Sequence, residues 1–256
     1  MFDKPILAHE EVLELTRGGV MNEGLVSLAL GLPGMPGAAE DVMIGRDIQL
    51  AEVTNGRLHV MHVSTAQGVA LVRDAKARGV RVTAEACPHH FTLTDESLRA
   101  FDSNFKMSPP LRTAADVDAI IAGLIDGTID CISTDHAPHA LEKKMLELDR
   151  APFGILGLET AVGLAVTRLI VPGRIGWPRL VEAMSTLPSR ILGIERGTLS
   201  DGAVADISII DPNISWQVDV EKFRSKSVNS PFHGWKLQGR AVTTIVNGRI
   251  KYQLDV

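Results

Sequence analysis

The sequence predicts an α/β protein, with a parallel α/β sheet or barrel in residues 1–196 and a small β module in residues 197–256. Short apolar runs alternate with longer stretches of helical periodicity through the first two-thirds of the chain, as in sheets whose parallel strands are joined by helices. After about Gly197 the pattern changes to β-forming runs separated by turn residues. We therefore expect two domains that meet at this change of pattern.

Four short apolar runs are predicted to be strands of the parallel sheet. At least three of them contain β-branched residues, which is typical of strands that are buried on both faces. These runs cover residues 5–8, 58–63, 80–86 and 130–134.

Helical spacing of apolar residues predicts the connections between these strands. Thr113 is a suitable N-cap residue and is followed by acidic residues, as at the start of many helices. The segment 18–37 is rich in Gly and Pro, so we expect an excursion over the mouth of the barrel, although a plain connector fits the same composition. The predicted helices cover residues 38–54, 66–78, 113–127, 157–169 and 177–185.

The β module is predicted from two β-forming segments, residues 203–210 and 241–251. Asp211-Pro212-Asn213 is expected to end the first segment, and Asn247-Gly248 is a dipeptide typical of β-hairpin turns.

Composition excludes several classes of protein. The hydrophobic fraction of 45% and the charged fraction of 22% are ordinary for a globular protein, and a net charge of -5 gives no basic footprint for nucleic acid. Neither a membrane-spanning apolar run nor a secretory signal pattern is evident. Two cysteines do not make a disulfide framework, so a cytoplasmic location is the simplest expectation.

Residues able to do chemistry follow the carboxyl ends of three predicted strands. His9 follows the first strand, His62 lies at the end of the second, and Asp135 follows the fourth. Side chains at these ends converge in (β/α) barrels, where that face carries the active site. Histidine and carboxylate are also ligands of catalytic zinc, so the pattern favours a metal site.

Each of these residues also has a plainer interpretation. His9 taken alone is more often a capping or solvated residue, and Asp135 alone would suit a turn cap. His59 should point away from His62, because side chains alternate along a strand, and we expect it to be hydrogen-bonded against the helical layer. His89 and His90 follow Cys87-Pro88, and a structural or supporting role is at least as good as a ligand role for both.

Other polar or reactive residues are expected to be structural. Cys87 and Cys131 lie in or beside predicted buried strands and are interpreted as small core residues. Glu142, Lys143 and Lys144 form a charge run that is predicted to be a solvated helix face.

Six short motifs carry a family resemblance: His62-Val63-Ser64-Thr65, Pro88-His89-His90, Asn104-Phe105-Lys106-Met107, Asp126-Gly127-Thr128-Ile129-Asp130, Thr134-Asp135-His136-Ala137-Pro138-His139 and Ala151-Pro152-Phe153-Gly154. In order and spacing they resemble the class I dihydroorotases of the amidohydrolase superfamily, from about Ile6 to the C-terminus. The Asp-His-Ala-Pro-His and Ala-Pro-Phe-Gly motifs together are specific, because hydantoinases and allantoinases share the metal scaffold but usually differ there.

The resemblance implies a function and a set of roles. His9 and His62 match ligands of a second zinc, and Asp135 matches the ligand of a first zinc that also shuttles a proton. The implied reaction is the reversible hydrolysis of (S)-dihydroorotate to N-carbamoyl-L-aspartate in de novo pyrimidine biosynthesis, by a zinc-activated hydroxide, with two zinc ions in a complete site and Asp135 as general base and acid. The matching substrate-binding residues are Ser108, His139, Phe153 and Gly154.

The sequence departs from the family in two ways. The family has a His-x-His pair on its first barrel strand and a bridging carboxylate on its fourth, and neither is present, so the resemblance implies about strands 5–8 of a TIM-type (β/α)8 barrel. Ser108 stands where the family usually has asparagine, which affects substrate fit. Four strands cannot close a barrel, so we expect an apolar edge on each side of the sheet. Such edges favour aggregation, so the chain should be poorly soluble or dimeric. With part of the ligand set absent, we also expect weak zinc binding and less than full activity.

Two other functions fit parts of the sequence. The first is a hydantoinase- or allantoinase-type cyclic amidohydrolase, which His139 and the Ala-Pro-Phe-Gly motif disfavour. The second is a non-catalytic partner of aspartate transcarbamoylase, as some dihydroorotase-like chains are. A non-catalytic chain is expected to have lost its metal-binding residues, whereas His9, His62 and Asp135 are present in this sequence.

Overall fold

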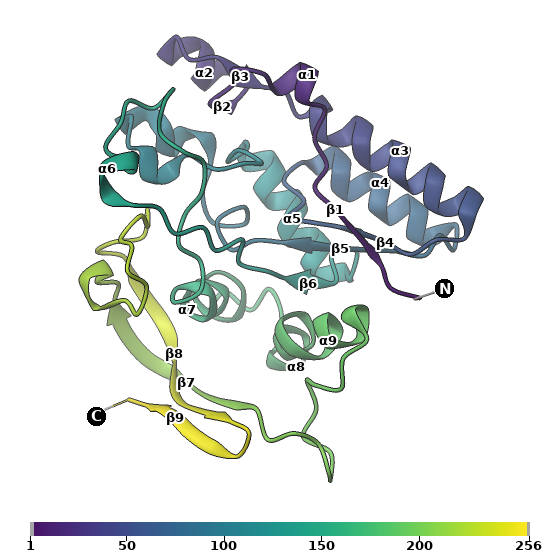
Figure 1. The fold of residues 1–256 in the computed structure, drawn as a ribbon, viewed down its shortest axis with the longest axis vertical. Helices are drawn as coiled ribbons and strands as arrows, with labels where there is room; N and C mark the ends of the chain where they lie inside the picture. The colour runs from purple at the N-terminus through teal and green to yellow at the C-terminus, as the bar shows by residue number, and fades with distance from the viewer. Residues whose placement is uncertain (1–2, 255–256) are drawn as a thin grey trace.

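A four-stranded parallel sheet forms the centre of the chain, which a computed structural model describes over residues 3–254 (Figure 1). Its strand order is β1-β4-β5-β6, and all neighbours run parallel. These strands confirm the four predicted positions but are shorter, because each predicted run extends into the loop at one or both ends. Their bounds are β1 (Ile6–Ala8), β4 (Leu58–Val60), β5 (Val82–Ala86) and β6 (Cys131–Ile132).

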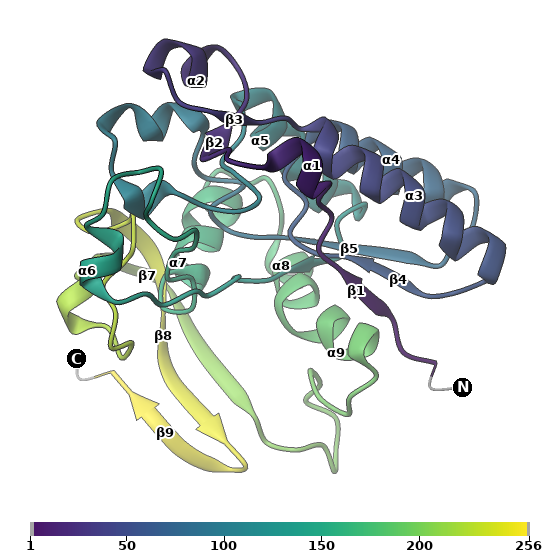
Figure 2. The same ribbon diagram turned by 45° about the horizontal axis from the view of Figure 1, so that its top comes forward.

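Three long helices cover one face of this sheet and lie side by side (Figure 2). They are α3 (Ala38–Thr54), α4 (Ala66–Ala77) and α5 (Ala114–Asp126), close to their predicted bounds. Thr113 and Asp116 form a reciprocal capping box at the start of α5, which confirms the predicted N-cap. Leu58 and Val60 of β4 are buried in the hydrophobic core that the sheet shares with these helices.

The segment 18–37 is more than a connector. It contains β2 (Met21–Asn22), α2 (Leu25–Leu30) and β3 (Gly34–Met35), and it follows the short α1 (Leu13–Thr16). Asn22 donates a hydrogen bond of 2.9 Å to the carboxylate of Asp95, in the 3-10 turn η1 (Asp95–Ala100). A second 3-10 turn, η2 (Ser103–Phe105), follows.

The last helices of the α/β part contain two π-helical stretches. Helix α6 (Leu141–Lys144) is followed by α7 (Ala161–Ala165), which begins later than predicted and continues as η3 (Val166–Ile170). The predicted helix 177–185 begins where expected but runs longer, as α8 (Trp177–Val181), η4 (Glu182–Thr186) and α9 (Leu187–Leu192). Arg57 donates to the carbonyl of Ile191, which places α9 beside the start of β4.

The carboxyl-terminal β module is an antiparallel sheet of β7 (Ile207–Gln217), β8 (Lys236–Val246) and β9 (Arg249–Gln253), with the short turn η5 (Val220–Lys222). Asn247 and Gly248 have φ values of 49° and 72°, which confirms the predicted hairpin turn. Asp211-Pro212-Asn213 does not end a strand, because β7 continues through it with a shift of register. An irregularity in pairing accommodates the proline there.

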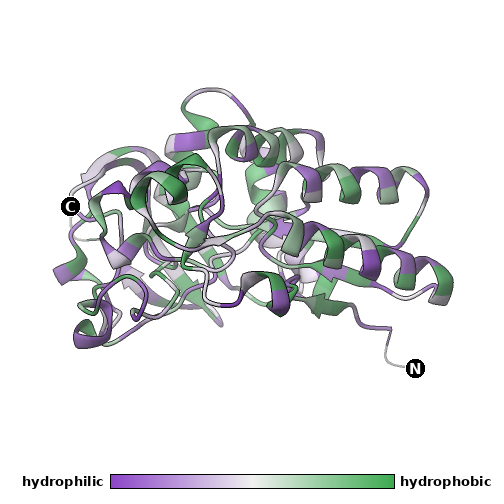
Figure 3. Ribbon diagram, turned by 90° about the horizontal axis from the view of Figure 1, so that it is seen from above, coloured by the Kyte–Doolittle hydropathy of each residue, from purple (hydrophilic) through white to green (hydrophobic). Residues whose placement is uncertain are grey.

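The two edges of the central sheet differ. Ile6 and Leu7 of β1 are 70% and 48% exposed, and Figure 3 shows hydrophobic β1 next to the amino-terminal trace. Cys131 and Ile132 of β6 are buried, and Arg179 of α8 donates to the carbonyls of Ile129 and Asp130 just before that strand. The sheet is open over the described residues, and β1 and β6 are its two apolar edges, as predicted; β1 is exposed, whereas the side chains of β6 are buried.

No helix within residues 3–254 has the length and apolar character needed to cross a membrane.

Candidate functional site

Two histidines meet above the carboxyl ends of β1 and β4. His9 directly follows β1, and His62 lies two residues beyond β4. Their Nδ1 and Nε2 atoms, respectively, are 3.1 Å apart, and the ring centroids are 4.8 Å apart in an edge-to-face arrangement. The structure therefore brings together two residues that are 53 positions apart in the sequence.

Asp135 lies near this pair, although none of its carboxylate oxygens is within 4.8 Å of ring nitrogens of both histidines. Burial raises the pKa of its carboxyl group, and the nearby His9 opposes that shift. Within the described part of the chain, no side-chain hydrogen bond ends on the Asp135 carboxylate, although the residue is half-buried. A carboxylate in this situation has unused acceptor capacity, which a cation would satisfy.

The backbone at two of these residues is strained. His62 and Asp135 have φ values of 33° and 45°, in the left-handed region that residues other than Gly adopt uncommonly, although Asp and His do so more often than most. Conformations of this kind cost on the order of 1–3 kcal/mol each and cluster at functional sites. Both residues lie just beyond the ends of strands, so the strain directs their side chains at the place where the strands converge.

Burial also fixes the protonation of His62. Desolvation and the neighbouring His9 lower the pKa of His62 to about 4, so its imidazole is neutral at physiological pH and has a lone pair to offer. Glu10, beside His9, is buried, and its two carboxylate oxygens have no hydrogen-bond partner in the described structure. Desolvation, followed by the charge of Asp47, raises the pKa of Glu10 to about 7.

His59 is hydrogen-bonded, as predicted, but on the other face of the sheet. Its ring nitrogens lie 2.8 Å from Thr83 Oγ1 and 3.1 Å from Glu85 Oε2 on the neighbouring β5. Leu58 and Val60 on either side of it pack toward the helices, so His59 points away from them. The expected position against the helical layer is wrong, because it rested on placing His62 within the strand, whereas the strand ends at Val60.

Three of the predicted substrate-binding residues, His139, Phe153 and Gly154, form a second group. His139 Nε2 lies 2.8 Å from the carbonyl oxygen of Phe153, and the bond requires that nitrogen to carry the ring proton. Gly154 has a φ of 120°, and a Cβ atom there would lie 2.6 Å from Ala137 Cβ. Only glycine therefore fits this turn of the loop beside His139.

Ser108 lies between the two groups. It lines a small pocket together with His9, Glu11 and Pro109. Gly154 donates its N–H to the carbonyl of Lys106, two residues before Ser108, so the segment that carries Ser108 runs beside the Phe153–Gly154 loop.

Two buried lysines hold the Phe153–Gly154 loop, which runs from residue 151 to residue 154. Lys106 donates to the carbonyl of Ala151 at 2.7 Å and lies 4.4 Å from the ring centroid of Phe153. Lys144 donates to the carbonyls of Pro152 and Gly154 at 3.0 and 3.1 Å. The prediction of a solvated helix face is therefore wrong for Lys144, which is buried because its aliphatic stem carries the ammonium group inward to these carbonyls.

Asn229 is a residue that sequence reasoning missed. Its amide donates to the carbonyls of Ala137 and Gly154, and its side-chain oxygen accepts from the N–H of His139. A single side chain thus ties together two loops that come from distant parts of the chain. The surrounding sequence is rich in polar residues and carries no signal that singles out Asn229.

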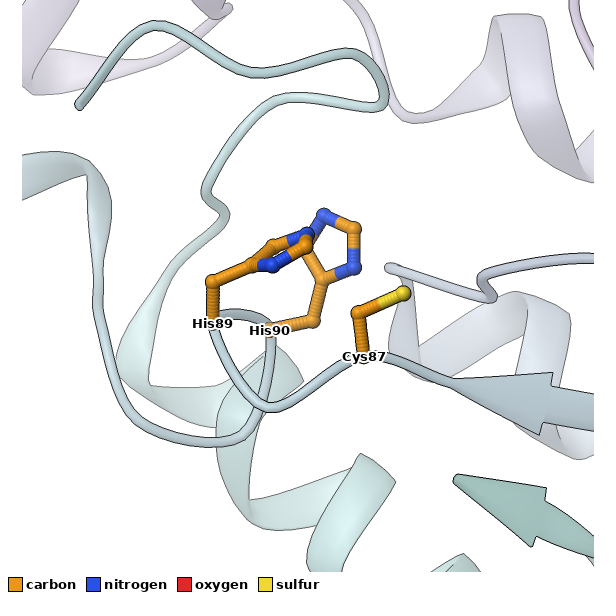
Figure 4. Close-up of side chains that lie close together, drawn as sticks. All are labelled: Cys87, His89 and His90. Atoms are coloured by element: carbon orange, nitrogen blue, oxygen red, sulfur yellow. The ribbon is translucent and has the colours of Figure 1, made fainter. Parts of the chain in front are cut away.

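A compact cluster of possible metal ligands follows β5. One ligand atom from each of Cys87, His89 and His90 lies within 4.8 Å of the others, and all three residues are buried. Figure 4 shows the three side chains gathered close together, with the two rings packed edge to face. The predicted burial of Cys87 and Cys131 is confirmed.

A larger hollow, of about 730 Å³, lies away from these residues. It lies where α7 packs against the β module and is lined by Trp216, Arg240 and Tyr252 among others. No histidine or cysteine lines it, so it has no ligand set like those described above.

Comparison with known proteins identifies relatives over nearly the whole chain. Residues 10–251 match the model of the amidohydrolase family. The chain is 53% identical to proteins named dihydroorotase from Citrifermentans bemidjiense and Acetivibrio thermocellus, covering 97% and 98% of this chain but 58% and 59% of theirs. The chain therefore spans less than two-thirds of the length of these relatives.

Solved structures support the same relationship at lower identity. The L-hydantoinase (dihydropyrimidinase) from Arthrobacter aurescens superposes with a TM-score of 0.88 and 30% identity, over 98% of this chain and 57% of that one. The dihydropyrimidinase from Brevibacillus agri gives 0.85 and 25%, over 96% and 56%. The match of a family model to most of the sequence decides the classification, and the chain belongs to the amidohydrolase family.

Proposed function

We propose that this chain carries part of the active site of a dihydroorotase, which interconverts (S)-dihydroorotate and N-carbamoyl-L-aspartate in de novo pyrimidine biosynthesis. The observation that carries the proposal is the meeting of His9 and His62 at the strand ends, with Asp135 near enough to His9 for their charges to interact. The relatives named dihydroorotase, at 53% identity, favour this cyclic amide over other substrates of the family.

Zinc fits the residues that are present. His9 Nδ1, His62 Nε2 and the Asp135 carboxylate are the atoms that would hold it, because the two nitrogens face one another and the carboxylate lacks a hydrogen-bonding partner among described side chains. We propose two zinc ions for a complete site. Zinc bound there supplies a water of lowered pKa and polarises the ring carbonyl.

The chain's own residues would handle the proton and the ring. Asp135 accepts the proton of the attacking water and returns it to the ring nitrogen as the amide bond breaks, so no net proton is consumed by the side chain. His139 is held by Phe153 and Asn229, and together with Ser108, Phe153 and Gly154 it would orient the substrate.

The test is to replace the matching 248 residues of the Citrifermentans bemidjiense relative with this chain and to measure turnover of dihydroorotate, hydantoin and allantoin. We expect kcat/KM to be highest for dihydroorotate. Asp135→Asn should lower kcat on the order of 10²–10⁴-fold, as loss of a general acid–base does. Turnover of the same three substrates is measured in parallel for this chain alone.

Two outcomes would favour the other functions. Faster turnover of hydantoin or allantoin would indicate a related cyclic amidohydrolase, which the solved hydantoinase relatives make the second candidate. No turnover, together with co-purification of aspartate transcarbamoylase, would indicate a non-catalytic partner. For the cellular location we propose the cytoplasm, because Cys87 and Cys131 are both unpaired.

A further inference from the structure

Cys87, His89 and His90 form a ligand set that the proposed reaction does not use. They leave β5 on the chain Cys87-Pro88-His89-His90, and the three side chains fold toward one another in a space from which solvent is excluded (Figure 4). His89 and His90 are each 2% exposed and Cys87 is 0% exposed. The group is separate from the pair formed by His9 and His62, which comes from β1 and β4.

Two ring nitrogens in this group have no hydrogen-bond partner. They are His89 Nε2 and His90 Nδ1, both buried within the part of the chain that the structure describes. A buried polar atom without a partner costs about 1–3 kcal/mol, so natural structures rarely keep one unless a water or an ion satisfies it.

The tautomer of His90 shows which kind of partner is missing. His90 Nε2 lies 2.9 Å from the carbonyl oxygen of Pro109, and a carbonyl only accepts, so Nε2 carries the ring proton. Nδ1 of the neutral ring is then left with a lone pair and no donor. Metal-binding histidines have the same arrangement, with one ring N–H donated to a backbone carbonyl and the other nitrogen on the metal.

We infer that Cys87, His89 and His90 form a thiolate-containing metal site for Zn²⁺ or a similar borderline-soft divalent ion, distinct from the site at His9, His62 and Asp135. One thiolate and two imidazoles are a ligand set that such ions take. Binding replaces the S–H bond of Cys87 with a sulfur–metal bond, and the thiol proton is released to solvent.

The distances and charges suit this assignment. Ligand atoms around a tetrahedral zinc are about 3.5 Å apart, given metal–ligand bonds of about 2.0–2.3 Å, and the present spacing of up to 4.8 Å closes to this with small side-chain rotations. An ion with one thiolate retains a positive charge. Burial raises the pKa of the Cys87 thiol, the hydrogen bond with Ser133 lowers it, and the negative charges of Glu85 and Asp135 raise it, so a bound cation would have to displace the thiol proton. Those two carboxylates would offset the remaining positive charge of a bound cation.

The experiment uses the purified chain, stripped of metal with a chelator and titrated with Co²⁺. Cobalt replaces zinc in such sites, and a cobalt–thiolate bond gives an intense near-ultraviolet charge-transfer band that imidazole and carboxylate ligands do not give. We expect this band in the wild-type chain and its loss in Cys87→Ser. Metal content after zinc loading should fall by about one ion per chain in the same variant.

Two controls separate this site from the rest of the molecule. Cys131→Ser removes the other buried cysteine and should keep the band. The double variant His9→Ala, His62→Ala removes the strand-end pair and should also keep it, so the result does not depend on the proposed hydrolase activity. Absence of the band from the cobalt-loaded wild-type chain, or its persistence in Cys87→Ser, would overturn the inference and leave buried water as the partner of the two nitrogens.

Discussion

Gly154 shows how one residue sets the shape of the Phe153–Gly154 loop. Its φ of 120° is a region that residues with a Cβ avoid, and the added carbon would lie 2.6 Å from Ala137 Cβ and 3.0 Å from His139 Nε2. We predict that Gly154→Ala lowers the free energy of unfolding by about 1–3 kcal/mol and displaces His139 from Phe153. Urea denaturation measures the first effect.

Gly173→Ala is the matched control for this change. Gly173 also has a positive φ, of 70°, but a Cβ atom there would meet nothing within 4 Å. The Gly173→Ala variant therefore has backbone strain from its positive φ but no close contact of the added Cβ atom. Equal losses in the two variants would contradict a steric role for the Ala137 and His139 contacts.

Lys144 couples the stability of the chain to pH. Burial, and then the charge of Lys106, lowers the pKa of Lys144 from 10.5 to about 8. Between these values the unfolded chain still holds the proton that the folded chain has lost, so stability rises with pH across this range. We predict that the free energy of unfolding of the wild-type chain increases from pH 8 toward pH 10 relative to Lys144→Met, in urea titrations at several pH values.

The neighbouring Lys143 supplies the comparison for Lys144. It is exposed, so Lys143→Met should leave the pH dependence of stability unchanged. If the difference in the free energy of unfolding between the wild-type chain and Lys144→Met stays constant from pH 8 to pH 10, then Lys144 keeps its charge in the folded state throughout that range.

At the scale of elements, Arg112 joins the segment before α5 to three others. Its guanidinium donates to Ser64 Oγ at 3.0 Å, to Asn22 Oδ1 at 3.0 Å and to the carbonyl of Met35 at 2.8 Å. It also lies 3.4 Å from the carboxylate of Glu40, and both of these charged side chains are 4% exposed. The segment 18–37 is thereby fixed above the ends of the strands.

Removing Arg112 should be costly because it leaves Glu40 buried without its cation. We predict that Arg112→Met lowers the free energy of unfolding by about 3–5 kcal/mol. Adding Glu40→Gln should recover part of this loss, since the unpaired charge is then absent. A double-mutant cycle in urea measures the coupling, and strictly additive effects of the two substitutions would refute the assignment of the cost to the ion pair.

The helices and strands with regular apolar spacing were predictable from sequence. Where the predictions were wrong, the error has a physical cause. Helices α3, α4 and α5 match because each has strong local signals, such as the Thr113 cap. Strand β7 runs through Asp211-Pro212-Asn213 because its pairing with β8 tolerates a bulge, a property of the partner strand that local sequence does not contain. Lys144 was assigned to solvent because its buried acceptors, the carbonyls of Pro152 and Gly154, become neighbours only through the fold.

The candidate site was predictable in part for the same reason. His9, His62 and Asp135 were found because parallel strands bring their carboxyl ends together, a rule that operates at long range. Asn229 was missed because it reaches the site from a loop between strands of the β module, and no periodic pattern marks it. The roles of Ser108, His139, Phe153 and Gly154 in substrate binding stay predictions.

At the scale of the whole molecule, β1 is an exposed apolar edge. Ile6 is 70% exposed, and the outer side of β1 has no strand partner among the described residues. Edges of this kind pair with other chains unless a charge blocks them. We predict that the chain by itself self-associates, and that Ile6→Lys shifts it toward the monomer in size-exclusion chromatography with light scattering.

Val53→Lys is the control for this prediction. Val53 is 86% exposed but lies on helix α3, which offers no unpaired strand edge. It should therefore not change the mass of the chain in solution. A monomeric wild-type chain, or the same reduction in mass from both lysine variants, would contradict a role for the β1 edge.

The most direct test of the account is anomalous diffraction at the zinc absorption edge from crystals of the chain grown with zinc. The account predicts zinc bonded to His9 Nδ1 and His62 Nε2, and zinc bonded to the Asp135 carboxylate, above the carboxyl ends of β1, β4 and β6. A map with no peak among these three side chains, at zinc concentrations that fill other sites in the crystal, would contradict it.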